Sequence, residues 1–524
     1  MNHRLTIFVP GIGSHTDKWD ILISRLKADP DFKEMKWMPW NHNCGLYSMK
    51  DPHNLALALA AAIDQETTLK ESIDEITLIG HSMGGLLVRQ AFLFAMGDYA
   101  GMPRMAWSTK VSRIVLLASL NRGLNPKNFR IALWDKFLKV WAPLRAFKPM
   151  LTQHLMRGSS FVSDLRIRWM RNFAAISGNA PTIVQILGNN DGIVTRADSV
   201  DLDQFPKAFH LSIADAPHRL LHRLEKAPDP EARYAIFKMA LLKNHMENAD
   251  VRIPSEGKQR IVFVLHGIRA ANRDWVHDAE KVIRQQMGND TEVVTPGYGY
   301  LSALEFAIPV LHQRPIQRFQ NLYSDYLATS PGADFYFLGH SNGTYILGQS
   351  LKDLEGMRFK HIALAGSVLP RDFPWRQLWK NGQFVALRND QANHDVPVGI
   401  LCNGLRGLGR RDVGVGGFEG FNDKDNHIQQ YSFHRGGHSA ALEENNLQSM
   451  VEFLEKGKDA PLPEPQTRNV GYMGLFSRLG FFIIPLLVVS IVIAFALAIY
   501  LQSFELGAGV AGLIIALVFI LKVL

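Results

Sequence analysis

Two serines occur in the same pentapeptide pattern, GHSMG around Ser82 and GHSNG around Ser341. In each copy an apolar segment, 76–79 or 335–338, runs directly into the pentapeptide, and a segment of helical character follows it. A strand, a sharp turn and a helix in this order present the serine hydroxyl at the start of the helix, where it can act as a nucleophile. The pattern therefore predicts covalent chemistry on serine at two places in the chain.

A serine nucleophile needs a base, and the base needs an acid that orients it. Aspartates and histidines that follow apolar strands supply both in each half of the chain. The predicted sets are Ser82, Asp191 and His218 in the first half and Ser341, Asp412 and His438 in the second. The separation in sequence from acid to histidine is 218 − 191 = 27 in the first set and 438 − 412 = 26 in the second. This agreement favours two independent triads.

The second set departs from the first in two ways. Asp412 follows the Gly- and Arg-rich stretch 404–411 instead of a strand, so Asp423 or Asp425 is an alternative acid. The separation from serine to acid is 412 − 341 = 71, against 191 − 82 = 109 in the first half, which predicts that the second site lacks a cap. His210 and His434 are alternative bases.

Backbone amides at two places are expected to stabilise an oxyanion. One is the first residue of the helix after each serine, and the other lies in the glycine turn after the first strand of each half. The predicted donors are Met83 and Ile12 in the first half and Asn342 and Ile268 in the second. The separation from the turn glycine to the serine is 82 − 11 = 71 in one half and 341 − 267 = 74 in the other, so the two halves agree.

The elements that must position these residues repeat in one order across 1–457. We expect strands at 5–10, 76–79, 114–118, 182–187 and 209–213, and again at 261–265, 334–338, 362–365, 396–401 and 429–433. Most are continuous apolar runs, which are typical of parallel strands covered by helices on both faces. The sequence therefore predicts an α/β fold, with two tandem doubly wound domains at 1–248 and 259–457.

The composition is that of a globular protein, with 524 residues, 47% hydrophobic, 20% charged and a net charge of +8. The stretch 122–171 carries eleven Lys and Arg against two Asp, and we expect it to form a helical cap with a solvated basic face. Within it, 129–141 is amphipathic enough to lie on an anionic membrane, so no nucleic-acid partner is expected. Cys44 and Cys402 lack metal-ligand spacing, and 404–409 has the wrong glycine spacing for a nucleotide site, so neither metal nor cofactor is predicted.

Two apolar runs end the chain, at 481–501 and 506–524, after a Pro-rich linker at 458–478. A helix of the first run would measure about 31 Å, enough to cross a bilayer, and we expect a transmembrane hairpin over 479–524. Lys and Arg flank the outer ends of both runs, which predicts a multi-pass membrane protein with both domains cytoplasmic. Glycines at 507, 509 and 512 can bring helices together, so homo-oligomerisation is left open.

The motif sets resemble those of the α/β-hydrolase superfamily, and GHSMGG with an Asp-Gly-x-Val acid loop is similar to its lipase and esterase branch. The resemblance spans both domains and none of the tail. It implies hydrolysis of an acyl ester, here expected to be a lipid, with Ser82 attacking, His218 carrying the proton and Asp191 orienting the imidazole. An acyltransferase with the same triad is the alternative, as is a second domain that serves as a binding or scaffold module.

Overall fold

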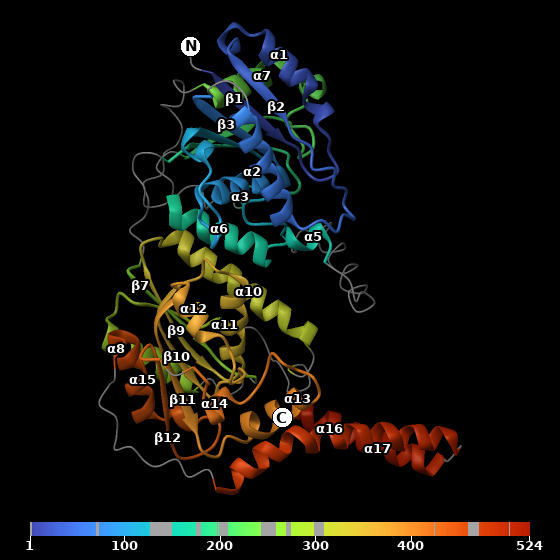
Figure 1. Ribbon diagram of the computed structural model, residues 1–524, viewed down its shortest axis with the longest axis vertical. Helices are drawn as coiled ribbons and strands as arrows, with labels where there is room; N and C mark the ends of the chain where they lie inside the picture. The colour runs from blue at the N-terminus through green and yellow to red at the C-terminus, as the bar shows by residue number, and fades with distance from the viewer. Residues whose placement is uncertain are drawn as a thin grey trace. The chain divides into compact units, whose positions relative to one another are not determined.

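The computed structural model describes residues 3–69, 73–125, 149–173, 180–195, 198, 208–242, 258–268, 274–297, 306, 309–423, 425–458, 471–501 and 504–523. The chain forms two compact units (Figure 1). Unit 1 comprises Met1–Gly257 and Gln320–Gly332, and unit 2 comprises Lys258–Phe319 and Ala333–Leu524.

Unit 1 is built on a parallel six-stranded sheet with the strand order β2-β1-β3-β4-β5-β6. Its strands are β1 (Arg4–Val9), β2 (Met35–Pro39), β3 (Glu75–His81), β4 (Val111–Leu117), β5 (Thr182–Gly188) and β6 (Ala208–Ile213). Its helices include α1 (Asp20–Ala28), α2 (Pro52–Leu69), α3 (Met83–Met96), α5 (Leu151–His154), α6 (Ser160–Phe173) and α7 (Pro230–Leu241). The five predicted strands are confirmed, and β2 is an additional edge strand.

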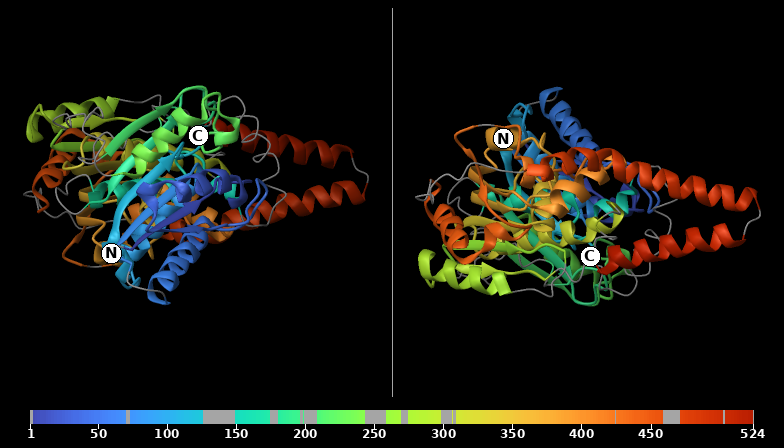
Figure 2. Two further views of the ribbon diagram at one scale, coloured as in Figure 1. Left: turned by 90° about the horizontal axis from the view of Figure 1, so that it is seen from above. Right: turned by 90° about the horizontal axis from the view of Figure 1, so that it is seen from below.

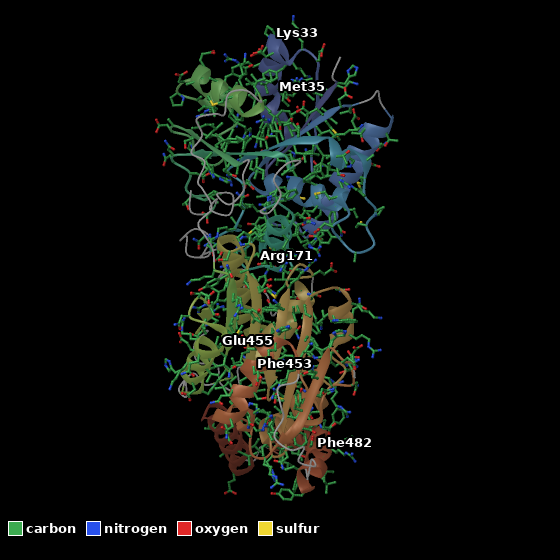
Figure 3. All side chains as sticks on the ribbon, turned by 90° about the vertical axis from the view of Figure 1, so that its left-hand side faces the viewer. Lys33, Met35, Arg171, Phe453, Glu455 and Phe482 are labelled. Atoms are coloured by element: carbon green, nitrogen blue, oxygen red, sulfur yellow. The ribbon has the colours of Figure 1, made fainter. Side chains whose placement is uncertain are left out.

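Unit 2 repeats this sheet, with the order β12-β11-β10-β9-β7-β8. Its strands are β7 (Arg260–Leu265), β8 (Glu292–Val294), β9 (Asp334–His340), β10 (Phe359–Ala365), β11 (Phe384–Ala392) and β12 (Ile428–His434). Its helices include α8 (Asp274–Met287), α11 (Asn342–Asp353), α12 (Trp375–Lys380), α13 (Asn403–Gly407), α14 (Gly416–Glu419) and α15 (Glu444–Lys456), and α10 (Pro309–Thr329) begins in unit 2 and ends in unit 1. Helices α8 and α15 lie side by side against the sheet, where residues of both bury the core around Phe453 (Figures 1 and 3).

The strand predicted at 396–401 is wrong, because β11 precedes it and 396–401 belongs mainly to the π-helical turn η7 (Pro397–Cys402). Strand β11 was not predicted because its buried second half is polar. Its Arg388 guanidinium donates to both carboxylate oxygens of Asp390, at 2.7 and 2.8 Å, so these charges are paired inside the unit. The apolar run after it is a partly buried helical turn, which periodicity cannot distinguish from a short buried strand.

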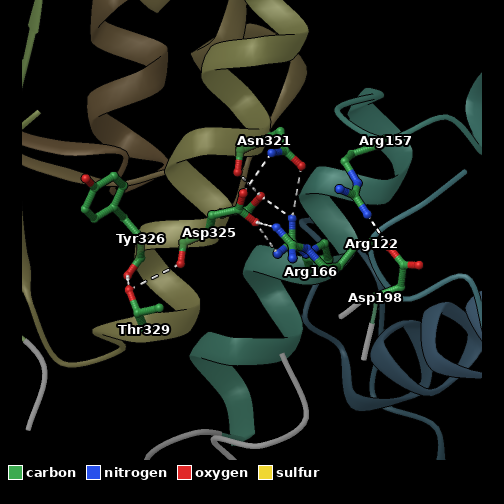
Figure 4. Close-up of polar contacts among 9 residues, drawn as sticks. Arg122, Arg157, Arg166, Asp198, Asn321, Asp325, Tyr326 and Thr329 are labelled. Carbon is green, nitrogen blue, oxygen red and sulfur yellow. Dashed lines mark hydrogen bonds and ion pairs between the residues drawn. The ribbon is translucent and has the colours of Figure 1, made fainter. Parts of the chain in front are cut away.

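The described part of the basic stretch 122–171 is not a solvated face; its residues 126–148 lie outside the described residues. Arg166 on α6 is 1% exposed, and its guanidinium donates to Ser324 Oγ at 2.7 Å and Asp325 Oδ1 at 2.8 Å, both on the part of α10 that belongs to unit 1 (Figure 4). Arg122 also donates to Asp325 Oδ1, at 2.6 Å. The expectation of a solvated basic face is therefore wrong at these positions.

The chain ends in two helices, α16 (Gly471–Tyr500) and α17 (Phe504–Val523), which lie close together where α16 ends and α17 begins and diverge from there (Figure 2). By length and composition α16 can cross a membrane, and it is the one such helix among the described residues. Phe482 on α16 is 68% exposed, in contrast to the buried Phe453 of unit 2 (Figure 3). Helix α16 begins inside the predicted linker, of which 459–470 lies outside the described residues, and the second span stays a prediction.

Candidate active site

Ser82 stands at a strained turn between β3, which ends at His81, and α3, which begins at Met83. Its φ of 54° and ψ of −117° lie outside the regions that residues with a side chain ordinarily adopt. The turn also requires glycine beside it, because a Cβ on Gly84 would lie 2.2 Å from the carbonyl oxygen of Val9. The predicted elbow is therefore present, and its glycine is needed for close approach of the backbone.

The three residues predicted in the first half form one hydrogen-bonded chain. His218 Nε2 lies 2.8 Å from Ser82 Oγ, and His218 Nδ1 lies 2.8 Å from Asp191 Oδ2. The Asp191 side chain is 0% exposed and also accepts hydrogen bonds from the amides of Ile193 and Val194. With the Nδ1 proton donated to Asp191, Nε2 is left to accept the proton of the serine hydroxyl.

The predicted oxyanion donors of the first half lie beside Ser82. Met83 is the first residue of α3, and amides in the first turn of a helix have no acceptor within the helix. A Cβ on Gly11 would lie 3.1 Å from Ser82 Cβ, so the turn that carries Ile12 rests directly against the serine. These contacts are compatible with the predicted role of the two amides in binding an oxyanion, which stays a prediction.

The histidine that precedes each serine supports the base and is not itself a base. His81 Nε2 donates to the carbonyl oxygen of His218 at 2.7 Å, and His340 Nε2 donates to that of His438 at 3.2 Å. Burial, and then the neighbouring base, lowers the pKa of His81 to about 3 and that of His340 to about 3. Both imidazoles are therefore neutral at physiological pH and hold the backbone behind the bases.

Unit 2 contains the same elbow around Ser341. The φ of 53° and ψ of −122° at Ser341 match those of Ser82, and α11 begins at the next residue, Asn342. A Cβ on Gly267 would lie 2.7 Å from Ser341 Cβ, so the turn that carries Ile268 rests against the second serine. The residues that carry the predicted donors, Asn342 and Ile268, thus adjoin Ser341 or its contact glycine in sequence, and their role as oxyanion donors stays a prediction.

The acid of the second set is Asp395, and the prediction of Asp412 is wrong. His438 Nδ1 lies 2.9 Å from both carboxylate oxygens of Asp395, whose side chain is 0% exposed. Asp412 is instead paired with Arg410 at 2.8 Å and accepts a hydrogen bond from the Tyr345 hydroxyl at 2.6 Å. Burial alone would raise the pKa of Asp412, but these two partners lower it to about 2.

The alternative acids and the alternative base of unit 2 are also occupied elsewhere. Asp423 accepts a hydrogen bond from the amide of Arg376, and the Asp425 carboxylate lies 3.9 Å from the guanidinium of the same arginine. His434 Nε2 lies 2.6 Å from Asp390 Oδ1. Each of these side chains therefore has a partner outside the predicted set.

A local signal identifies Asp395 in retrospect. Asp191 comes three residues after the end of β5, 191 − 188 = 3, and Asp395 comes three residues after the end of β11, 395 − 392 = 3. Each acid is followed three residues later by a valine, Val194 or Val398, whose amide donates to the carboxylate at 2.9 or 3.0 Å. The separations from acid to histidine are 27 in unit 1 and 438 − 395 = 43 in unit 2, so the agreement between 27 and 26 was a coincidence.

In the second site the serine and the histidine are not hydrogen-bonded as they are in the first. Among the residues that the structure describes, no hydrogen bond joins Ser341 Oγ to His438, whereas Ser82 and His218 are bonded. A Cβ on Gly366, which has a φ of 52°, would lie 2.9 Å from His438 Nδ1, so this glycine lets the loop after β10 rest against the imidazole. In the described ranges no group of three His, Cys, Asp or Glu side chains could hold a metal ion.

Comparison with known proteins gives a family match in the first half of the chain and solved structures of low similarity. Residues 7–245 match the model of the alpha/beta hydrolase family. The solved structure of a soluble variant of monoglyceride lipase from Saccharomyces cerevisiae, in complex with a substrate analogue, is 12% identical, covers 47% of this chain and 88% of its own, and has a TM-score of 0.33. A lipase-esterase related protein from Clostridium acetobutylicum is 13% identical, covers 45% of this chain and 94% of its own, and has a TM-score of 0.29.

No curated protein matches the chain in sequence. The family match lies entirely in the first half of the chain and supports the α/β-hydrolase superfamily there. The protein is a hydrolase.

Proposed function

We propose that the protein cleaves a carboxylic ester through an acyl-enzyme formed on Ser82. The observation that carries the proposal is the unbroken chain of hydrogen bonds from Ser82 through His218 to the buried Asp191. In this proposal Ser82 Oγ attacks the ester carbonyl while His218 Nε2 takes the hydroxyl proton and then delivers it to the leaving alcohol. Asp191 stabilises the imidazolium, and the amides of Met83 and Ile12 bind the oxyanion.

A second site of the same kind is proposed at Ser341, with His438 as base and Asp395 as acid. Support comes from the backbone at Ser341, whose positive φ costs on the order of 1–3 kcal/mol at a residue that is not glycine. A domain kept only as a scaffold would not need to retain this strain. Hydrogen bonds in substrate-free sites are often loose, so the unbonded serine is compatible with activity.

The proposed substrate is a lipid, reached from the cytoplasmic side of a membrane. The support is α16, which has the length and apolar composition of a span and carries many large exposed side chains from Phe481 onward. Helix α17 is proposed to complete the hairpin. Self-association through the glycines of α17, and the absence of a nucleic-acid partner, stay predictions from the sequence.

Labelling with a fluorophosphonate, followed by peptide mass mapping, tests the proposal. We expect adducts on both serines in the intact chain, on Ser341 alone in Ser82→Ala, and on Ser82 alone in Ser341→Ala. Heat-denatured protein is the control, because an adduct that requires the folded triad must disappear from it. A folded protein without an adduct on Ser82 would exclude the proposed mechanism, and transfer of acyl groups to an added alcohol in preference to water would favour an acyltransferase.

A further inference from the structure

An open pocket of about 420 Å³ lies in unit 2, where α16 meets the loops after β10 and β11. Its walls are polar and carry more positive than negative charge. The lining residues are Arg371, Asp372, Asn403, Arg406, Val415, Glu419, Asn422 and Arg478. Three guanidinium groups against two carboxylates leave the pocket with a charge of 3 − 2 = +1.

The two carboxylates do not satisfy all the guanidinium donors. Arg371 pairs with Glu419 at 2.7 Å, and Arg406 pairs with Asp372 at 3.1 Å through one nitrogen, Nη2. The other nitrogen of Arg406, Nη1, is buried without a hydrogen-bond partner among the described residues, and Arg478 is exposed to solvent. A planar guanidinium with free N–H groups favours a tetrahedral oxyanion such as a phosphate.

The wall that carries Arg478 is fixed to the rest of unit 2. Helices α13 and α16 approach so closely that a Cβ on Gly407 would lie 2.1 Å from the carbonyl oxygen of Phe481, and one on Gly404 would lie 2.1 Å from Ile484. Arg478 precedes the apolar run, which starts at Phe481, by about one turn of helix. If α16 spans a bilayer, the pocket is held at the level of the lipid headgroups.

Two segments that line the pocket also belong to the surroundings of the second catalytic set. Arg371 lies in the same loop as Gly366, which rests against the His438 ring. On the other side, the His394 ring beside the acid Asp395 contacts the ring of Tyr472 on α16, with centroids 6.3 Å apart. The pocket therefore shares with the second catalytic set the loop after β10, which contacts the base, and the segment after β11, which carries the acid.

We propose that this pocket binds the phosphate of an anionic glycerophospholipid and thereby sets the substrate class of the Ser341 site. The inference rests on the proposed function, because it requires the membrane anchor and the second acyl-ester site. A phosphate held beside the catalytic loops would present the acyl ester of the same lipid to Ser341, whereas a neutral glyceride would lack the anchoring charge.

Binding is measured on the full chain carrying Ser82→Ala and Ser341→Ala, in dodecylmaltoside, so that turnover plays no part. The probe is dihexanoyl phosphatidylglycerol in isothermal titration calorimetry. We expect Arg478→Gln and Arg406→Gln each to weaken binding by about tenfold or more, since each removes a charge-assisted hydrogen bond. Arg478→Lys, which keeps the charge but not the planar guanidinium, should lose less affinity than Arg478→Gln. Arg314→Gln, an exposed arginine of α10 outside the pocket, is the matched control and should bind as the parent does.

Inorganic phosphate and glycerol phosphate distinguish a lipid from a soluble ligand. Either of them binding as tightly as the lipid, with the same dependence on Arg478, would overturn the lipid assignment. Lipid binding unchanged in both glutamine variants would overturn the pocket as the site. If the fluorophosphonate leaves Ser341 unlabelled while the pocket still binds the lipid, the headgroup site stands and its role in setting the substrate of Ser341 is overturned.

Discussion

Replacing Asp395 by asparagine separates the acid found in the structure from Asp412. The Asp395 carboxylate is fully buried, accepts from His438 Nδ1 through both oxygens, and holds the amide of Val398 with one of them. An asparagine that keeps the bond from Val398 turns its NH₂ group toward His438, which moves the imidazole proton from Nδ1 to Nε2. A protonated Nε2 cannot accept the proton of Ser341.

The expected loss follows from this change of tautomer. An asparagine in place of the orienting acid lowers the rate of a serine triad by about 10⁴, which corresponds to about 5 kcal/mol of transition-state stabilisation. Asp412→Asn should instead leave reactivity within a few fold. Its cost is in stability: the pKa of Asp412 falls from 3.8 to about 2 on folding, which after solvent screening of this partly exposed side chain amounts to about 1 kcal/mol at neutral pH. That contribution is present above pH 3.8 and is lost as the pH falls toward 2.

The assay is the rate of fluorophosphonate labelling of Ser341, followed in a Ser82→Ala background so that only the second site reacts. Urea unfolding of the same variants reports stability. A normal labelling rate in Asp395→Asn together with a collapse in Asp412→Asn would refute the assignment. If Asp395→Asn shows no unfolding transition and is therefore not folded, Asp395→Glu replaces it as the test. This variant keeps the charge and should retain part of the labelling rate.

Three further outcomes are expected. The buried His81 and His340 have pKa values of about 3, below the unfolded value of 6.5, so the unfolded chain binds their protons at a higher pH than the folded chain. The free energy of unfolding should therefore fall as the pH drops from 6.5 toward 3, by about 2 kcal/mol per histidine at pH 5, as measured by urea unfolding. Equal stability at pH 7 and pH 5 would contradict this. Gly84→Ala should abolish labelling of Ser82 while that of Ser341 persists, and full labelling of both serines would show that the turn tolerates a methyl group. The intact chain should resist carbonate extraction from membranes, and a chain ending at residue 458 should be extracted. Extraction of both chains would refute the prediction of a membrane anchor.

The sequence was sufficient where one physical requirement governed a segment. The elbows at Ser82 and Ser341 were predicted because an apolar strand, glycines that allow close backbone contact and a helix must follow in that order. The strands flanking them were predicted because parallel strands covered on both faces are uniformly apolar. The edge strands β2 and β8 were not predicted, since a short strand at the margin of a sheet carries a weak pattern.

The acid of the second site was missed for a physical reason that began in β11. This strand buries Arg388 and Asp390 as a paired network, so its composition does not identify it as a strand. Because β11 was not predicted, the loop after it could not be located, and Asp395 could not be recognised as an aspartate that directly follows a strand. Equal spacing then favoured Asp412, although loop length between catalytic residues varies freely and only their place at the strand ends is constrained.

The segment Gln320–Gly332 gives unit 1 a dependence on the order in which the chain is synthesised. Asp325 forms ion pairs with Arg122 and Arg166. It is synthesised long after both arginines, since even Arg166 precedes it by 325 − 166 = 159 positions. Until then both arginines remain hydrated on an incomplete surface, so the first unit can gain its sheet and elbow early but not its final set of contacts. A nascent chain released before residue 332 would therefore carry an assembled Ser82 site on a unit that still lacks its last segment.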